Sequence, residues 1–347
     1  MPLLEIRNLT VNFETGKGQA RVIDGLNLTV EQGEILAVVG ESGSGKSVTA
    51  MSVMGLLPAQ AHVGAGSQIL FDGVDLLTLT PAMMRQRRGK DIAMIFQDPM
   101  SSLDPCYTIG DQLTETILAH KKIPKAEAFQ QALALLRQVK MTEPERRMKQ
   151  YPHELSGGMC QRVMIAMALS THPRLLIADE PTTAVDVTIQ AQILALLREL
   201  NERLGITIIM ITHDLGVVAE LCQQVLVMYA GGCVEYTRVE SLFTQPRHPY
   251  TLGLMNSRPT LERVGRMLTP IEGNPPDLTR RSGGCQFSAR CNQAMPRCRE
   301  SMPRLTPLAR GREWPEDGMA RFSLSPRISE RYNDHLVACF LVGTEEQ

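Results

Sequence analysis

The chain has 347 residues, more than one typical domain, which favours a main domain with a smaller appended one. Hydrophobic residues make up 43 % of the sequence, and the net charge of −1 gives no basic footprint for binding nucleic acid. No basic segment with an apolar core opens the sequence, so we expect a protein that is not exported. The uncharged stretch 47–71 is broken by Pro58 and several polar residues, whereas a transmembrane helix needs about 20 mostly apolar ones.

Two segments near the start, 3–11 and 22–30, alternate apolar and polar residues and have turn residues between them. This alternation predicts two strands of a small antiparallel β subdomain. The run 35–39 is wholly apolar, which is typical of a strand buried at the centre of a parallel sheet.

A complete G-x-x-x-x-G-K-S motif follows this run at residues 40–47, and the segment after it has helical spacing. This strand–loop–helix context is the one in which the motif binds phosphate, with backbone N–H groups and a helix N-terminus facing the anion. Lys46 would lie near the β- and γ-phosphates, and the Ser47 hydroxyl would bind Mg²⁺. The sequence therefore predicts a nucleoside triphosphate site. The expected binding residues are Gly40, Glu41, Ser42, Gly43, Ser44, Gly45, Lys46, Ser47 and Val48.

Polar side chains end three further apolar runs of the chain. Asp179 and Glu180 end one run, Gln97 ends the run 92–96, and His213 ends the run 206–212. Because the carboxyl ends of parallel strands meet at one edge of a sheet, these residues are candidates for one catalytic site.

Each of these four residues has a chemical role that suits such a site. Asp179 is expected to hold Mg²⁺, and Glu180 to polarise the attacking water. The Gln97 amide can contact metal and water without adding charge, and the His213 imidazole can hydrogen-bond the γ-phosphate. Taken singly, a solvated carboxylate pair and a structural histidine remain open alternatives.

Two helical features lie between these strands. The segment 125–138 has apolar residues at helical spacing, which predicts a helix, with a merely solvated face as the alternative to a docking role. Ser156, Gly157 and Gly158 precede a second helical run, and a serine with glycines there forms another anion-binding helix end. Since the chain has one phosphate loop, this end is expected to serve the nucleotide of another subunit.

Four of the eight cysteines, Cys285, Cys291, Cys298 and Cys339, fall in the last quarter of the chain. In a protein that is not exported, clustered cysteines suggest a metal before a disulfide. Four thiolates hold either zinc or a [4Fe–4S] cluster. Structural zinc prefers C-x₂₋₄-C pairs, which these cysteines lack, and an unmetallated tail is the third alternative.

Together these motifs resemble the ATPase subunit of ATP-binding-cassette (ABC) transporters, over roughly residues 3–250. The phosphate loop, Gln97, the segment 155–159, Asp179-Glu180, the segment Ala184-Val185-Asp186 and His213 occur in the family's order. The family usually has glutamine at Met159 and leucine at Val185, and neither departure removes a phosphate contact. Phe13 is similar to the family's aromatic residue that stacks on adenine.

The resemblance implies a mechanism. Two cassettes pair head to tail, and each ATP lies between the phosphate loop of one and Ser156 of the other. Glu180 activates water, His213 senses the γ-phosphate, and Asp186 belongs to the D-loop. The segments 98–107 and 151–154 would contact membrane subunits.

A closer resemblance covers the C-terminal part of the chain. Residues 245–251, 273–276, 284–287 and 290–291 are similar to the dipeptide/oligopeptide importer subgroup, which includes nickel and glutathione importers. Some members of that subgroup bind an iron–sulfur cluster at these cysteines, so the resemblance implies [4Fe–4S] ligation here, in a structural rather than a redox role. Forty residues separate Cys298 from Cys339, which is more than the subgroup usually has and makes Cys339 the least secure ligand.

We therefore expect an α/β phosphate-loop ATPase with an antiparallel β subdomain, a helical insert at about 98–172, and a cysteine-bearing extension at 251–347 after a cassette at 1–250. It would power di- or oligopeptide import with ATP and Mg²⁺, from the cytoplasmic face of the bacterial inner membrane. The expected partners are a second cassette subunit that is a different chain, two transmembrane permeases and, indirectly, a periplasmic solute-binding protein, but no nucleic acid. The alternatives are nickel or glutathione import, a non-transport ABC ATPase, and a metal-sensing module.

Overall fold

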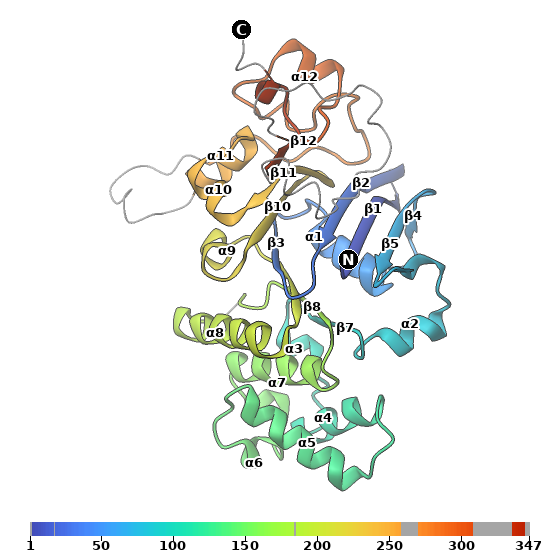
Figure 1. Ribbon diagram of the computed structural model, residues 1–347, viewed down its shortest axis with the longest axis vertical. Coiled ribbons are helices and arrows are strands. Elements are labelled where there is room, and N and C mark those ends of the chain that lie inside the picture. The colour runs from blue at the N-terminus through green and yellow to red at the C-terminus, as the bar shows by residue number, and fades with distance from the viewer. Residues whose placement is uncertain (1, 17, 184, 258–269, 308–334, 344–347) are drawn as a thin grey trace. The chain divides into compact units, whose positions relative to one another are not determined.

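The computed structural model describes residues 2–16, 18–183, 185–257, 270–307 and 335–343 (Figure 1). Internal contacts divide the chain into two compact units. The first unit consists of Met1–Glu31, Leu36–Leu77 and His213–Gln347, and the second of Gln32–Ile35 and Thr78–Thr212. The C-terminal extension thus belongs to the same unit as the β subdomain and the phosphate loop.

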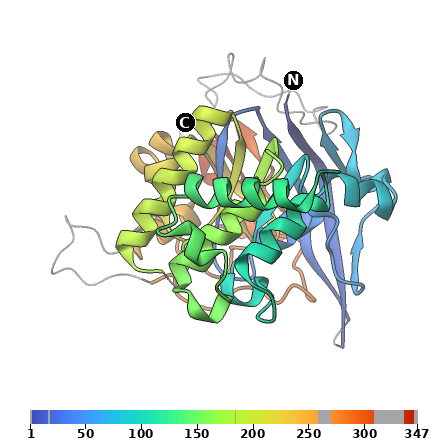
Figure 2. The same ribbon diagram turned by 90° about the horizontal axis from the view of Figure 1, so that it is seen from below.

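The antiparallel sheet of the first unit is built on two long strands, β1 (Leu4–Thr15) and β2 (Gly18–Val30), seen in blue in Figure 2. The two predicted strands are confirmed, and apolar side chains are buried at alternate positions in parts of each, at Leu9 and Val11 of β1 and at Leu26, Leu28 and Val30 of β2. The short strands β4 (Ala61–Val63) and β5 (Gln68–Phe71) pair with β1, and β6 (Val74–Asp75) pairs with β5. The 3₁₀ turn η1 (Leu76–Thr78) follows.

A second group of strands in this unit surrounds β3 (Ile35–Val39), which pairs in parallel with β10 (Gln224–Tyr229). The strand β11 (Gly232–Arg238) is antiparallel to β10, and β13 (Leu336–Val337) joins β11 and β12 (Thr306–Pro307). The extension therefore adds strands to the sheet that carries the phosphate loop. The helices of the unit are α1 (Lys46–Met54), α9 (Leu215–Leu221), α10 (Val239–Thr244), α11 (Pro249–Asn256), α12 (Pro296–Glu300) and the 3₁₀ turn η4 (Phe340–Gly343).

One hydrophobic core joins the cassette part of this unit to the extension. Val39 of β3 and Val227 of β10 share this core with Tyr250 of α11 and with Phe287 of the extension. Cys285 and Cys291 pack against the same core. Burying large side chains from both segments in one core stabilises them together.

The second unit contains three fully parallel, wholly apolar or nearly apolar strands, β7 (Ile92–Ile95), β8 (Leu175–Asp179) and β9 (Thr207–Ile211), in the order β9-β8-β7. All residues of β8 and β9 are buried, as the continuous hydrophobic runs predict. The helices of this unit are α2 (Pro81–Arg87), α3 (Pro99–Ser102), α4 (Ile109–Leu118), α5 (Lys125–Gln138), α6 (Pro144–Arg147), the 3₁₀ turn η2 (Pro152–Glu154), α7 (Gly157–Leu169) and α8 (Val187–Leu204).

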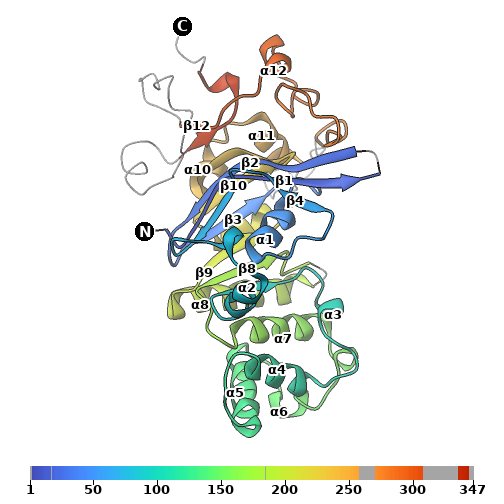
Figure 3. The ribbon, with the colours of Figure 1, turned by 90° about the vertical axis from the view of Figure 1, so that its right-hand side faces the viewer.

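Helices α4, α5 and α6 lie together, and α7 packs between them and β7 (Figures 1 and 3). The amphipathic pattern of residues 125–138 is confirmed, since α5 has these bounds and buries Ala128, Ala132 and Leu136. Among the helices that the structure describes, none combines the length and the apolar character needed to span a bilayer.

Candidate nucleotide-binding and hydrolysis site

The phosphate loop connects β3 to α1 in a conformation that depends on glycine. Gly40 has φ 153°, and a Cβ atom there would meet the Met228 carbonyl oxygen at 2.3 Å. Gly45 has φ 104°, and its Cβ would lie 3.1 Å from the Val22 carbonyl oxygen. No side chain can replace these hydrogens without moving backbone, so both glycines serve close packing as well as the turn.

Lys46 begins α1 and its ammonium group turns back over the loop. Its Nζ donates to the carbonyl oxygens of Gly40 and Glu41, at 2.8 and 3.0 Å. Lys46 is only 7 % exposed, so this loop holds a buried cation beside the N-terminus of a helix. Both features favour a bound anion.

The other loop residues and Phe13 differ in exposure. Ser42 and Gly43 are exposed, Ser47 and Val48 are half-buried, and Ser44 is buried. The Ser44 Oγ is a buried polar atom without a hydrogen-bond partner in this structure, which suits a loop shaped for a ligand. Phe13, half-buried on β1, pairs with Ala20 of β2 and Ala61 of β4.

In the second unit the structure brings Gln97 and Glu180 together. The Gln97 amide nitrogen donates to Glu180 Oε2 at 2.9 Å, and the Thr183 hydroxyl donates to the same oxygen at 2.9 Å. Glu180 has a left-handed backbone with φ 47°, which is uncommon for a non-glycine residue. A strained backbone conformation persists only where the surrounding structure holds it in place, and such residues are concentrated at functional sites.

Asp179 is the last residue of β8 and is 5 % exposed, in register with Ile211 of β9. His213 follows β9 by two residues and is exposed. Thus Asp179 and Glu180 follow the parallel strands at their carboxyl ends, as the sequence predicts. The phosphate loop belongs to the first unit, and Gln97, Asp179 and Glu180 belong to the second.

The predicted second anion-binding end is also in the second unit. Ser156 is the N-cap of α7, with its side chain accepting a 3.4 Å hydrogen bond from the Met159 N–H. Ser156 and Gly157 are exposed, whereas Gly158 is buried against Ile189, whose Cγ2 would lie 2.7 Å from an added Cβ. Asp186 caps α8 by accepting from the Ile189 N–H at 2.9 Å, while Ala184 lies outside the described residues.

The four C-terminal cysteines line a single pocket, together with His248, Phe287 and Phe340. The Cys285 N–H donates to the Cys298 carbonyl oxygen at 2.8 Å, which ties two cysteine segments together. Burial raises the pKa of the Cys285, Cys291 and Cys339 thiols, that of Cys339 to about 11, and the neighbouring thiols add to the rise.

The arrangement of side chains in the cysteine pocket does not confirm a metal site. Among the described residues, no group of three or more His, Cys, Asp or Glu side chains is arranged to hold a metal ion. The iron–sulfur ligand set expected from the sequence is therefore not confirmed and stays a prediction. What the structure does show is that Cys339 lies at the same pocket as the other three, despite its distance along the chain.

Sequence reasoning missed three residues that contact the predicted site. The Thr183 hydroxyl donates a hydrogen bond to the Glu180 carboxylate. Nothing in the sequence distinguishes Thr183 from the neighbouring Thr182 as the donor. Arg290 and Tyr250 both contact Glu41 of the phosphate loop. These two contacts join residues more than two hundred positions apart, and no motif spacing marks them.

Comparison with known sequences gives matches along most of the chain. Residues 23–183 match the ABC transporter family, and residues 234–298 match the C-terminal region of oligopeptide/dipeptide transporters. The oligopeptide transport ATP-binding protein OppD of Salmonella typhimurium is 51 % identical over 301 residues, which are 87 % of this chain and 89 % of that protein. The dipeptide transport ATP-binding protein DppD of Bacillus subtilis is 50 % identical over 301 residues, 87 % of this chain and 90 % of that protein.

A probable peptide ABC transporter ATP-binding protein of Sinorhizobium fredii is 52 % identical over 310 residues, covering 89 % of this chain and 92 % of that protein. Among solved structures, a dimeric post-hydrolysis ATP-binding cassette bound to ADP and phosphate matches with TM-score 0.62 and 26 % identity, over 68 % of this chain and 98 % of that one. The chain cbiO1 of Clostridium perfringens, part of an ABC transporter complex, matches with TM-score 0.60 and 27 % identity, over 76 % of this chain and 97 % of that one. The chain therefore belongs to the ABC transporter family, among the ATP-binding proteins of oligopeptide and dipeptide transport.

Proposed function

We propose that this chain is the ATP-hydrolysing subunit of a binding-protein-dependent ABC importer of di- or oligopeptides. The observation that carries the proposal is the phosphate loop: a buried Lys46 beside a helix N-terminus, in a turn that only glycines allow. The peptide substrate is supported by relatives of similar length that are named as oligopeptide and dipeptide transport proteins.

The residues divide the work as follows. Residues 40–48 bind the phosphates, and Phe13 stacks on adenine. Ser47, Gln97 and Asp179 supply hydroxyl, amide and carboxylate oxygens, which are the ligands that Mg²⁺ prefers. When bound, the ion neutralises charge on the β- and γ-phosphates.

Glu180 is the general base for the attacking water, and His213 contacts the γ-phosphate. The two donors on Glu180 Oε2 fix the direction of the carboxylate, which would accept the proton of the attacking water. This positioning, rather than covalent chemistry, accounts for catalysis in phosphoryl transfer.

Hydrolysis requires a second cassette subunit. The N-terminus of α7, at Ser156 and Gly157, is exposed in this chain, and a helix N-terminus of this kind binds phosphate. Because the phosphate loop already binds this chain's own nucleotide, the α7 N-terminus is assigned to the nucleotide of the partner. Asp186, the N-cap of α8, is the D-loop residue of the same proposed arrangement. The similar solved cassette is a dimer, which supports this arrangement for our chain. We infer a partner cassette of different sequence.

Membrane attachment is assigned to the exposed apolar residues after Gln97. Met100 is 45 % exposed and Tyr107 is 55 % exposed, and Tyr151 is 39 % exposed beside His153. Exposed aromatic and methionine side chains of this kind are enriched at protein interfaces. The two permeases would bind here, with the chain on the cytoplasmic face of the bacterial inner membrane and the solute-binding protein on the other side.

The cysteine pocket is the proposed site of a [4Fe–4S] cluster. Its support is the donor set: Cys285, Cys291, Cys298 and Cys339 line one pocket, and four thiolates suit such a cluster. These four cysteines would hold the cluster, which would cross-link the segments of the extension that carry them. Because the thiols of Cys285, Cys291 and Cys339 have raised pKa values, loading would release protons and would be favoured as pH rises.

The experiment that tests the function is affinity purification of the full chain from membranes, followed by peptide uptake in cells that carry the chain or its Lys46→Ala variant. We expect hydrophobic permease subunits to co-purify and a labelled tripeptide to accumulate with the unaltered chain only. Co-purification with ribosomes instead of permeases, or equal peptide uptake by the two strains, would reject the importer. Iron and sulfide analysis of the anaerobic protein, with Cys298→Ser as the comparison, tests the cluster.

A further inference from the structure

The phosphate loop residue Glu41 is held by two side chains of the C-terminal part of the chain. Arg290 binds its carboxylate with two parallel hydrogen bonds, from Nη1 to Oε2 at 2.6 Å and from Nη2 to Oε1 at 3.0 Å. The Tyr250 hydroxyl accepts the Glu41 backbone N–H at 2.8 Å. A two-pronged arginine–carboxylate pair fixes both distance and orientation.

Arg290 is itself immobilised by the extension. Its Nε donates to the Glu272 carbonyl oxygen at 3.0 Å and its Nη2 to the Ile271 carbonyl oxygen at 3.2 Å. Its Nη1 also donates to the Tyr229 hydroxyl at 3.3 Å. The Arg290 side chain is 5 % exposed, against 27 % for Glu41, so the guanidinium is a fixed part of the structure and not a surface group.

Tyr250 is fixed by a cluster of aromatic rings. Its ring lies 4.6 Å from that of Tyr229 and 5.4 Å from that of Phe287, between centroids. Burial raises the pKa of Tyr250 and of Tyr229, so both hydroxyls stay protonated at neutral pH. The acceptor that meets the Glu41 N–H is thus neutral and rigid.

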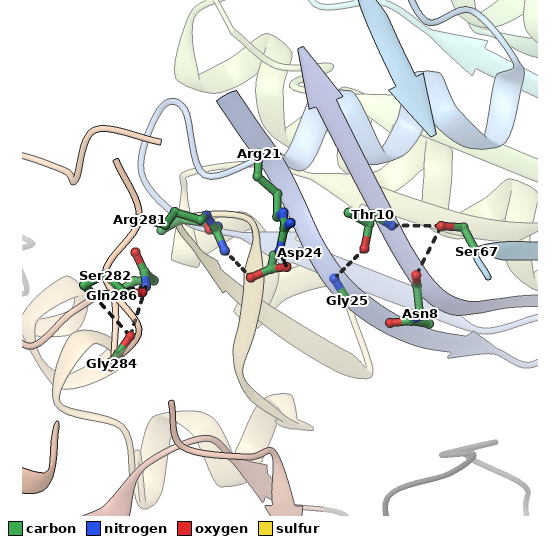
Figure 4. A network of polar contacts seen from close by, with 11 residues as sticks. Asn8, Thr10, Arg21, Asp24, Gly25, Ser67, Arg281, Ser282, Gly284 and Gln286 are labelled. Atoms are coloured by element: carbon green, nitrogen blue, oxygen red, sulfur yellow. Dashed lines mark hydrogen bonds and ion pairs between the residues drawn. The ribbon is translucent and has the colours of Figure 1, made fainter. Parts of the chain in front are cut away.

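A second arginine anchors the same extension to β2. Arg281 pairs with Asp24, which also pairs with Arg21 at 3.1 Å (Figure 4). Arg281 also donates to the Ala230 carbonyl oxygen. Gln286 lies beside Ser282 and Gly284 (Figure 4). Its amide nitrogen donates to the carbonyl oxygens of both residues at 2.9 Å, which fixes the segment between the two arginines. Besides the strand pairing and the shared core, two arginines thus hold the extension, and one of them does so at the phosphate loop.

Charge explains why the loop needs this contact. A free carboxylate at Glu41 would place negative charge in a loop that must attract phosphate, and an ion pair with Arg290 cancels that charge. The Glu41 carbonyl oxygen is also an acceptor of the Lys46 ammonium, at 3.0 Å, so a shift of Glu41 would shift Lys46. Both effects act on the affinity for ATP.

We propose that Arg290 and Tyr250 are positioning residues for the phosphate loop, which makes the C-terminal extension a working part of the nucleotide site. The inference rests on the proposed function in one respect, that this loop binds ATP. The pair acts on binding and not on the chemical step, because it contacts the loop and not Gln97 or Glu180.

The test measures ATP affinity and hydrolysis in the purified transporter for Arg290→Ala, Glu41→Gln/Arg290→Ala, Tyr250→Phe and the control Arg299→Ala. The control removes an exposed arginine from the same extension. We expect Arg290→Ala to raise KM for ATP about tenfold with kcat changed less than about twofold, which is the split for lost ground-state binding. Glu41→Gln should restore most of that affinity when added to Arg290→Ala, because it removes the unpaired charge.

Tyr250→Phe keeps the aromatic core and removes only the acceptor, so it reports on positioning even if Arg290→Ala folds poorly. We expect it to weaken ATP binding about threefold to tenfold, as for one lost neutral hydrogen bond. The proposal is overturned if Arg290→Ala and Tyr250→Phe bind ATP like Arg299→Ala, or if Glu41→Gln restores nothing. Lys46→Ala distinguishes a failure of this proposal from a failure of the proposed function. Unaltered ATP binding by that variant would reject the phosphate loop as the ATP site.

Discussion

The Gln97 amide and the Glu180 carboxylate are joined by a hydrogen bond of 2.9 Å, although 83 positions separate them in the chain. The pair forms because β7 and β8 are neighbours in parallel register, so that the segments after their carboxyl ends meet. The left-handed backbone of Glu180 turns its side chain toward Gln97 and Thr183. A carboxylate held in this way is ready to orient a water molecule without first reorganising.

Glu180→Gln should lower kcat for ATP by about 10² to 10⁴, because the base is lost while the side-chain volume is kept. ATP affinity should remain within about twofold, since the phosphate loop is untouched. Steady-state phosphate release and calorimetric titration of ATP measure the two quantities. Glu202→Gln, which alters an exposed carboxylate on α8, is the matched control. Wild-type turnover in Glu180→Gln would remove Glu180 from the role of base.

Thr183→Val should lower kcat about threefold to tenfold, which is the effect of removing one neutral hydrogen bond from the base. The side chain keeps its shape, and Gln97 still donates to the same carboxylate oxygen. Because the hydroxyl stabilises the ionised carboxylate, the acid limb of the pH–rate profile should also move to higher pH. A fall in stability with an unmoved profile would assign Thr183 a structural role only.

The sequence predicted the elements whose signal is local. The helix 125–138 has the predicted bounds because its apolar residues recur with the helical period, and the phosphate loop is marked by its own glycines. The strands β12 and β13 have two residues each, too few for any period to show. Their pairing with β11 depends on contacts between distant segments.

Long-range pairs were equally hidden. The contact between Glu41 and Arg290 joins positions 249 apart, and the Thr183 donor stands beside a second threonine, Thr182, from which the sequence does not distinguish it. The predicted boundary at residue 250 stays a prediction, yet Tyr250 and Phe287 pack in one core with Val39. Patterns along the chain report which face an element buries, but not which distant side chain meets it.

Ser156→Ala and Ser156→Asp together should separate capping from catalysis. Alanine removes the N-cap of α7, at a cost of about 1 kcal/mol, whereas aspartate keeps a capping acceptor. Both should abolish most ATP hydrolysis by the paired cassettes, because alanine offers no phosphate contact and aspartate repels the γ-phosphate. The melting temperature should fall for alanine only. Full hydrolysis in either variant would show that Ser156 does not act on a partner's nucleotide.

A pH dependence of stability should arise at His248, the N-cap of α11. Its Nδ1 accepts the Tyr250 N–H at 3.1 Å, and burial lowers the pKa of the imidazole to about 4. The negative charge of the Glu235 carboxylate raises the pKa of His248 but does not outweigh burial. The Oε1 atom of Glu235 lies 2.6 Å from the Nε2 atom of His335. In the unfolded chain the pKa is 6.5, so the unfolded state binds more protons between about pH 4 and 6.5.

His248 therefore makes the folded protein lose stability as pH falls below about 6.5, by about 2 kcal/mol at pH 5 relative to pH 7.5. Burial raises the pKa of Glu235, but hydrogen bonds from His335 and other donors together outweigh burial and lower that pKa below 4.5, so the contribution of Glu235 to stability is lost only under more acidic conditions. Urea unfolding at the two pH values measures the difference. His248→Asn keeps a capping acceptor but cannot be protonated, and it should flatten the profile, whereas the exposed His172→Asn should not. An unchanged slope in His248→Asn would place the acid sensitivity elsewhere in the chain.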